Sequence, residues 1–293
     1  MLGKLFKYEW KGFRFPLLVM LIVMLGTTAL TCGMILSINP QFDEAFEGYS
    51  VFSLVVSIML YYFGLIGCSL GVILIVAIRF YKTCYSDQGY LTHTLPVSAQ
   101  KMLNVKIIAS FLMVLATTLV MFVTIIVILN VGIDHILAIA AAKNSESAAD
   151  IADMRREMSR AMALAFDNFK DYMGISLGAY VAYMLVFYLV SLISNIITVL
   201  GCVSLGQLYA KHRVIGAIAA YIAVHFIQQI LVSFIAILPM YGRMLNTVSY
   251  NRKYTAFGMM SPTMNLTLII TIIIGVAMYF INLHMMTKKL NLE

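Results

Sequence analysis

Residues 107–133 read IIASFLMVLATTLVMFVTIIVILNVGI, a run of 27 residues without a single Asp, Glu, Lys or Arg. About 20 such residues in a helix cross the roughly 30 Å of hydrocarbon in a bilayer. A helix satisfies its own backbone hydrogen bonds, and the alternating ten-residue pattern of a membrane strand is absent here. The run therefore predicts a membrane-spanning helix.

Five more uncharged stretches of this kind surround it, over residues 15–38, 51–78, 173–209, 214–241 and 263–287. Hydrophobic residues make up 62% of the chain and charged residues 11%, against about 45–50% and about 25% in soluble proteins. This composition excludes a soluble, a disordered or a disulfide-rich protein. The sequence predicts an all-α polytopic membrane protein, with six transmembrane helices in one transmembrane domain over residues 1–293.

The charged residues between these stretches are distributed unevenly. The N-terminal segment, residues 79–106, residues 211–213 and the tail carry twelve bases and three acids, whereas the other segments carry eight bases and ten acids. The positive-inside rule then places both termini in the cytoplasm. The stretch 173–209 is long enough for two crossings, which would move the last four of these bases outside. We expect one long helix instead.

Residues 1–14 form a pattern typical of an amphipathic helix lying in the headgroup plane. Aromatic and aliphatic side chains recur on one side, and bases on the other. The residues that define this interfacial helix are Lys4, Lys7, Trp10, Lys11 and Arg14. The segment is either a topology anchor in membrane lipid or an elbow that also contacts a cytoplasmic partner, and the two roles are compatible.

The segment 134–172 forms the long loop between the third and fourth spans, on the predicted outer side. Ser147 and Asp150 suggest a helix start, and apolar residues then recur at helical spacing. We expect an external amphipathic helix over 148–170, with Asp153–Arg156 and Glu157–Arg160 pairs on its wetter face. It is either a cap on the outer membrane surface or a gate that receives substrate.

Motifs for enzyme chemistry are absent from the sequence. There is no Gly-x-x-x-x-Gly-Lys-Ser/Thr phosphate loop, no His-Glu-x-x-His and no paired-cysteine metal motif. We therefore expect no enzyme activity, no catalytic residue, no metal and no cofactor in this chain. The chain has a net charge of +7, and many of its basic residues flank the predicted spans. We therefore expect no nucleic acid partner.

Polar residues inside the spans mark a candidate pathway, because such side chains at mid-depth face protein or a water-filled route. The candidates are Tyr61, Tyr62, Tyr221, His225, Gln228 and Gln229. Hydrogen bonding between helices is the alternative explanation. Gly67-x-x-x-Gly71 and Gly174-x-x-x-Gly178 predict close helix packing.

The cytoplasmic segment 81–100 has the local chemistry of a helix, a turn and a second helix. Residues 87–89 read DQG, which favours a turn, Pro96 ends a helix, and Ser98 caps the next. The run DQGYLTHTLPVS over 87–98, followed by Lys101 and Lys106, resembles a segment of ABC-2-type transporter permeases from Gram-positive bacteria. The start LFKYEWK at residues 5–11 is similar to the start of the same family. The large external loop of this chain lies between spans 3 and 4, whereas many members of that family have it between spans 5 and 6.

The resemblance implies the membrane permease subunit of an ATP-binding-cassette exporter in the bacterial cytoplasmic membrane. It implies two ABC ATPase subunits, which hold ATP and Mg, and a second permease, identical or paralogous. The loop between spans 2 and 3 then acts as the coupling helix. The ATPase-coupling residues would be Lys82, Tyr85, Asp87, Gln88, Gly89, Tyr90, Leu91, Thr92 and His93.

An amphipathic peptide, antibiotic or lipid suits an apolar route as substrate. Two other functions remain open. One is a non-transporting ABC-like sensor or resistance module that uses the external helix. The other is an ion-coupled carrier, although His225 is the only ionisable candidate inside a span.

Overall fold

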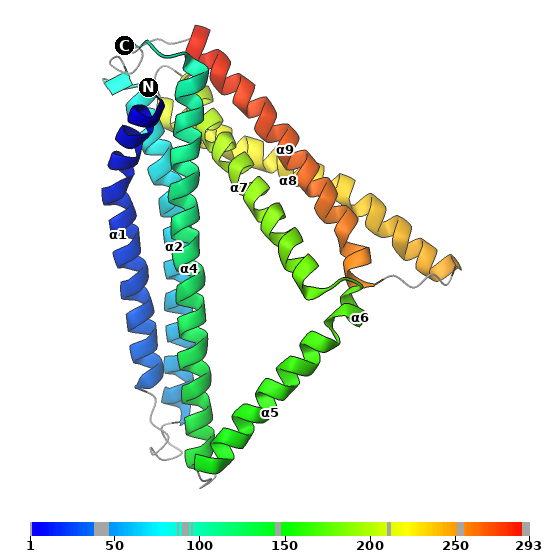
Figure 1. The fold of residues 1–293 in the computed structure, drawn as a ribbon. Coiled ribbons are helices and arrows are strands. Elements are labelled where there is room, and N and C mark those ends of the chain that lie inside the picture. The colour runs from blue at the N-terminus through cyan, green and yellow to red at the C-terminus, as the bar shows by residue number, and fades with distance from the viewer. Residues whose placement is uncertain are drawn as a thin grey trace. The chain divides into compact units, whose positions relative to one another are not determined.

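The computed structural model describes residues 2–37, 47–86, 88–89, 94, 96–143, 148–209, 212–250 and 255–288, and this part of the chain is helical without any strand. Figure 1 follows the chain from its N-terminus to its C-terminus. The helices are α1 (Leu2–Leu36), α2 (Glu47–Cys84), α4 (Ala99–Lys143), α5 (Ala148–Asp167), α6 (Phe169–Met173), α7 (Leu177–Gly206), α8 (Arg213–Tyr250) and α9 (Ala256–Lys288).

Six of these helices are long and apolar enough to cross a membrane: α1, α2, α4, α7, α8 and α9. Each overlaps one of the six predicted stretches, so the expected all-helical architecture with six membrane-capable helices is confirmed. The stretch 173–209 contains one 30-residue helix, α7, as expected. The chain has the character of a multi-pass membrane protein.

Several helices extend past the apolar stretches that predicted them. The sequence divides residues 1–14 from a first span that begins at residue 15, whereas α1 is continuous across this boundary and includes Pro16. Charged residues on one face of a helix do not end it, because the backbone hydrogen bonds continue beneath them. For the same reason α4 continues past Asp134 to Lys143, so the first part of the predicted loop 134–172 is helical.

The predicted external helix over 148–170 corresponds to α5 and the short α6. Gly174 follows α6 with φ of 80°, a conformation that favours glycine. The side chain of Ser176 then caps α7 by accepting a hydrogen bond from the Ala179 amide at 3.4 Å. Gly174 is thus a cap, and a Cβ on Gly178 would contact nothing within 4 Å. Close approach is found at Gly174, where a Cβ would lie 2.4 Å from the Thr255 side chain, but not at Gly178, so this pair of glycines does not form the expected motif for packing two helices.

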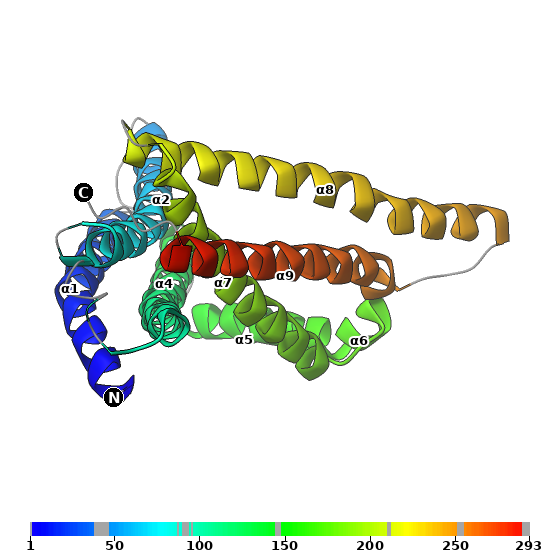
Figure 2. The same ribbon diagram turned by 90° about the horizontal axis from the view of Figure 1, so that it is seen from above.

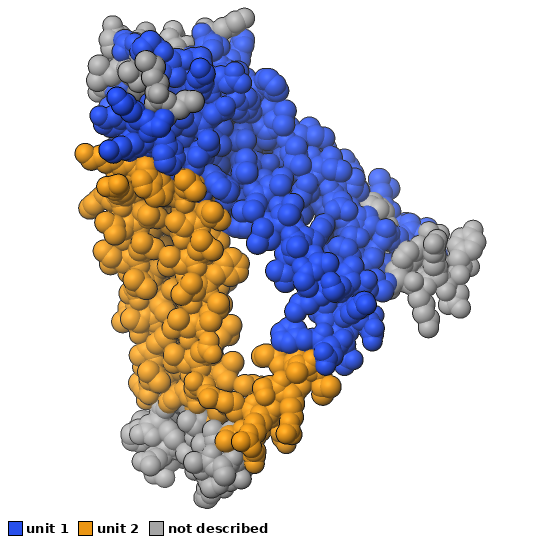
Figure 3. Space-filling model, viewed as in Figure 1, with its two compact units in different colours: residues 1–9, 76–111, 165–293 blue, residues 10–75, 112–164 orange. Residues whose placement is uncertain are grey.

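The chain forms two compact units (Figure 3). Residues 1–9, 76–111 and 165–293 form unit 1, and residues 10–75 and 112–164 form unit 2. In unit 2, Met24, Tyr61 and Cys68 are buried together. A Cβ at Gly71 would meet the Met20 side chain at 2.4 Å, so glycine allows close packing of α1 and α2 there. A Cβ at Gly67, the other glycine of the predicted motif, would contact nothing within 4 Å.

In unit 1, α7 packs against α8 and α9, and α8 also packs against α9. The view from above shows α8 and α9 on either side of the C-terminal part of α7 (Figure 2). A Cβ at Gly201 would lie 2.9 Å from the Met278 side chain, and one at Gly275 would lie 3.1 Å from Ser194. Small residues therefore let α7 and α9 approach closely.

Candidate functional site

The segment 81–100 joins the C-terminal end of α2 to the N-terminal end of α4, both in unit 1. Of its predicted coupling residues, Lys82 and Gln88 are exposed, and Tyr85 and Gly89 are buried. Asp87, Tyr90, Leu91, Thr92 and His93 lie outside the described residues. The two roots of this segment, residues 79–86 with 88–89 and residues 98–106, can therefore be described in detail.

A tight turn follows α2 and requires glycine at residue 89. The Gly89 amide donates a hydrogen bond to the carbonyl oxygen of Ser86 at 2.6 Å. A Cβ at Gly89 would lie 2.5 Å from the carbonyl oxygen of Cys84, which is closer than real Cβ atoms approach. Any larger side chain must displace the backbone that ends α2.

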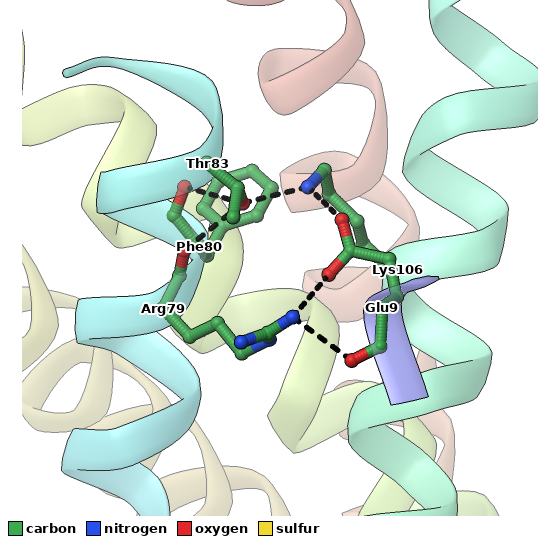
Figure 4. Close-up of polar contacts among 5 residues, drawn as sticks. All are labelled: Glu9, Arg79, Phe80, Thr83 and Lys106. Atoms are coloured by element: carbon green, nitrogen blue, oxygen red, sulfur yellow. Dashed lines mark hydrogen bonds and ion pairs between the residues drawn. The ribbon is translucent and has the colours of Figure 1, made fainter. Parts of the chain in front are cut away.

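A buried ionic cluster joins both roots of the segment to the first helix (Figure 4). Glu9 of α1 accepts a hydrogen bond from Lys106 Nζ of α4 at 2.5 Å. Its other carboxylate oxygen pairs with Arg79 Nη2 of α2 at 3.3 Å, and the same nitrogen donates to the Glu9 backbone carbonyl at 2.9 Å. One carboxylate thus holds a cation from each side of the connecting segment.

Thr83 completes the cluster on the α2 side. Its hydroxyl accepts a hydrogen bond from Lys106 Nζ at 2.6 Å and donates to the carbonyl oxygen of Arg79 at 2.9 Å. The side chains of Lys106, Glu9 and Arg79 are 4%, 10% and 22% exposed. Because a buried charge is costly unless it is paired, the carboxylate keeps the two cations, and with them the two roots, together.

The formal charge of this cluster is positive, since two cations share one carboxylate. Removal of Glu9 would leave two like charges close together, whereas removal of Lys106 would leave a neutral Glu9–Arg79 pair. Glu9 is therefore the residue on which the cluster depends most.

A second chain of hydrogen bonds leads from the turn into the body of unit 1. The Tyr85 hydroxyl donates to Ser204 Oγ of α7 at 2.7 Å, and Ser204 donates to Asn282 Oδ1 of α9 at 2.7 Å. Burial raises the pKa of the Tyr85 phenol above its ordinary value near 10, and the bond to Ser204 offsets this only in part. Tyr85 therefore stays neutral and links the end of α2 to α7 and α9.

The residues assigned to the interfacial helix lie along the first turns of α1. Lys4, Lys7, Lys11 and Arg14 are exposed, and Trp10 is half-buried. Glu9, between these bases in sequence, points into the cluster instead. The exposed bases thus leave the other side of α1 to pack against the protein.

The pathway candidates divide between the two units. Tyr61 of unit 2 is buried and shares a hydrogen bond with Thr124 at 2.9 Å, whereas Tyr62 is exposed. In unit 1, the Tyr221 and His225 rings lie edge to face, with centroids 4.2 Å apart.

Gln228 Nε2 of α8 donates to Thr271 of α9 at 3.1 Å, and Gln229 is exposed. The contacts of Tyr61 and Gln228 are hydrogen bonds between helices, as in the alternative explanation for these polar residues.

Six residues of the site are not among those predicted from the sequence: Glu9, Arg79, Thr83, Lys106, Ser204 and Asn282. Glu9 and Lys106 enter the sequence analysis as charges that set topology and as parts of the two segments that resemble the permease family, not as partners of one another. A signal for them exists, because Lys106 directly precedes the uncharged run 107–133 and Glu9 stands alone among bases. Asn282 lies well inside the last apolar stretch, where polar side chains normally face protein.

Within the described part of the chain, no group of three or more His, Cys, Asp or Glu is placed to hold a metal ion. The described part of the chain is that of a multi-pass membrane protein with six membrane-capable helices, in which Glu9 of α1 pairs with both helices that flank the segment 81–100. Comparison with models of known families, with curated proteins and with solved structures found no match to the chain.

Proposed function

We propose that this chain is the permease subunit of an ATP-driven exporter, of the ABC-2 type that its sequence resembles. In this proposal the segment 81–100 is the coupling element on which separate ATPase subunits act. The observation that supports this most directly is the cluster in which Glu9 fastens both roots of the segment through Arg79 and Lys106.

A simple connecting loop does not need this arrangement. Burying three charges at its base has a desolvation cost that a plain turn would avoid. A coupling element does need it, because a force applied to the loop is transmitted only if the loop cannot bend at its roots. The bonds from Tyr85 through Ser204 to Asn282 extend the same rigid attachment to α7 and α9.

The proposal includes an orientation and a set of partners. Both termini and the segment 81–100 face the cytoplasm of a bacterial cell, as the distribution of bases suggests. Two ABC ATPases supply ATP and Mg, a second permease completes the pathway, and this chain performs no hydrolysis. Closure of the ATPases moves the segment 81–100 and switches the pathway between its inward-open and outward-open forms.

The first test is a pull-down of the tagged, full-length chain from native membranes in mild detergent, followed by mass spectrometry. We expect a stoichiometric ABC ATPase, together with a second permease if the pair is not identical. A well-extracted, intact chain that retains no ATPase would contradict the proposal.

The second test measures flux of labelled amphipathic peptide in vesicles that contain the chain and the ATPase found with it. Export that requires ATP supports the proposal, and an ATPase-bound chain without flux is a sensor or resistance module. An ion-coupled carrier would instead follow a proton or sodium gradient, and His225→Ala would abolish its transport.

A further inference from the structure

Helix α5 carries two faces of opposite character. Met154, Met158 and Met162 follow one another at four-residue intervals, which places them within an arc of about 80° on one side of the helix. Met158 is 36% exposed and Met162 is 52% exposed. A continuous stripe of apolar side chains therefore lies open along α5.

The opposite face is charged and carries both acids and bases. Asp153, Arg156, Glu157 and Arg160 lie on it and are exposed, and Arg156 pairs with Asp153 at 3.2 Å. With seven charged residues in its 20 residues, α5 cannot cross a bilayer.

The position of α5 in the chain keeps it near the membrane. It starts five residues after the end of α4 and is followed, ten residues after its own end, by the start of α7, and both neighbours are long enough to cross a bilayer. Arg155 of α5 also pairs with Asp134 of α4, the residue that follows the uncharged run 107–133. This contact places Arg155 of α5 at the level where the uncharged run of α4 ends.

We propose that α5 lies along the membrane–water interface, with the stripe Met154–Met158–Met162 inserted among lipid acyl chains and the charged face in water. The stripe contacts the lipid surface, because α5 is connected at both ends to helices long enough to cross a bilayer. No other apolar phase is as close. Because α5 has four acids and only three bases, its charged face has no preference for anionic lipid. Insertion is driven by apolar burial and is insensitive to salt.

This inference requires only that the chain crosses a membrane, and it does not rest on the proposed export function. It also separates α5 from the start of α1, whose exposed residues Lys4, Lys7, Lys11 and Arg14 are all bases. Lipid charge affects that segment and leaves α5 unchanged.

The test places a tryptophan on each face of α5 in the full-length chain. Trp10 is the only native tryptophan, so the variant Trp10→Phe has no tryptophan fluorescence and serves as the parent for the others. Met158→Trp and Met162→Trp report on the apolar stripe, and Arg160→Trp on the charged face is the matched control. Each variant is reconstituted in nanodiscs of phosphatidylcholine, with or without bromine on the acyl chains near the headgroup, and titrated with aqueous acrylamide.

We expect bromolipid to reduce the fluorescence of Met158→Trp and Met162→Trp at least about twofold more than that of Arg160→Trp, with the opposite order for acrylamide. This difference should persist in 0.5 M salt and when anionic lipid is added. Thermal unfolding of each variant is compared with that of the parent to verify folding. The two methionine variants should give the same result, because both positions lie on the same stripe.

Three results would overturn the proposal. Equal acrylamide quenching on both faces would show that α5 stands in water. Shielding of the methionine positions from both quenchers would show that protein covers the stripe, as in a gate or a contact with a second copy. Loss of bromolipid quenching in salt would show that charge, and not apolar burial, holds α5 at the surface.

Discussion

The substitution Glu9→Gln tests the ionic cluster, because it removes a charge and preserves shape. Glutamine keeps an oxygen that can accept from Lys106, and the bond from Arg79 to the residue 9 backbone carbonyl is unaffected. What changes is the charge balance: two cations with side chains 4% and 22% exposed lose their shared anion. We expect the cluster to loosen and the protein to be destabilised.

The magnitude follows from the two contacts that Glu9 makes with Lys106 and Arg79. A hydrogen bond to a charged group contributes about 1.5–3 kcal/mol and a neutral one about 0.5–1.5 kcal/mol, so each contact loses about 1 kcal/mol or more. For Glu9→Gln we expect a loss of about 2–3 kcal/mol, and for Glu9→Ala a loss nearer the roughly 3–5 kcal/mol that an unpaired buried charge costs.

Lys106→Met is the matched control, because it removes one cation and leaves a neutral Glu9–Arg79 pair. We expect it to lower stability by less than about 1 kcal/mol, and the double variant with Glu9→Gln to recover about 1 kcal/mol of the Glu9→Gln loss. The assay is equilibrium unfolding in mixed micelles with increasing SDS, followed by helical circular dichroism.

Two results would refute this reasoning. One is a Lys106→Met variant at least as unstable as Glu9→Gln, since the cluster would then not carry an excess of positive charge. The other is a double variant whose loss is the sum of the single losses, since Glu9 and Lys106 would then not interact in the folded protein.

Two further predictions concern the turn after α2. Tyr85→Phe removes the donor to Ser204 and should cost about 1 kcal/mol at pH 7. Since burial raises the Tyr85 pKa, its protonated form stabilises the fold below pH 10, and this contribution is lost as pH rises above that value. Wild type should therefore lose more stability than Tyr85→Phe between pH 9 and about 11. A difference in stability between the two proteins that stays constant over this range would contradict the prediction. Gly89→Ala should lower ATPase stimulation in the reconstituted complex because its Cβ meets the Cys84 carbonyl oxygen, whereas Gly132→Ala, with open space around the Cβ, should leave stimulation unchanged; equal effects would remove the role assigned to the turn.

Parts of this fold follow from local sequence, and others do not. The apolar stretches predict all six membrane-capable helices, because hydrophobicity over about 20 residues is a local property. Helix ends are less predictable: the boundary expected near residue 14 is absent from α1, and α4 continues beyond Asp134. A helix starts and stops where its backbone is capped, and not where its apolar character changes. Gly174 caps the end of α6, and Ser176 caps the beginning of α7.

The candidate site divides in the same way. The sequence alone determined that this chain has six membrane-capable helices, with a polar segment around residues 81–100 between two of them. Tertiary structure alone decided that Glu9 meets Arg79, 70 residues away, and Lys106, 97 residues away, and that Tyr85 reaches Ser204, 119 residues away. No local pattern encodes such pairs, because a lone charge beside an apolar run looks the same in sequence whether it faces headgroups or a buried partner. The choice is made only when helices distant in sequence pack together, and the cost of burying an unpaired charge then selects the arrangement in which each charge finds its partner.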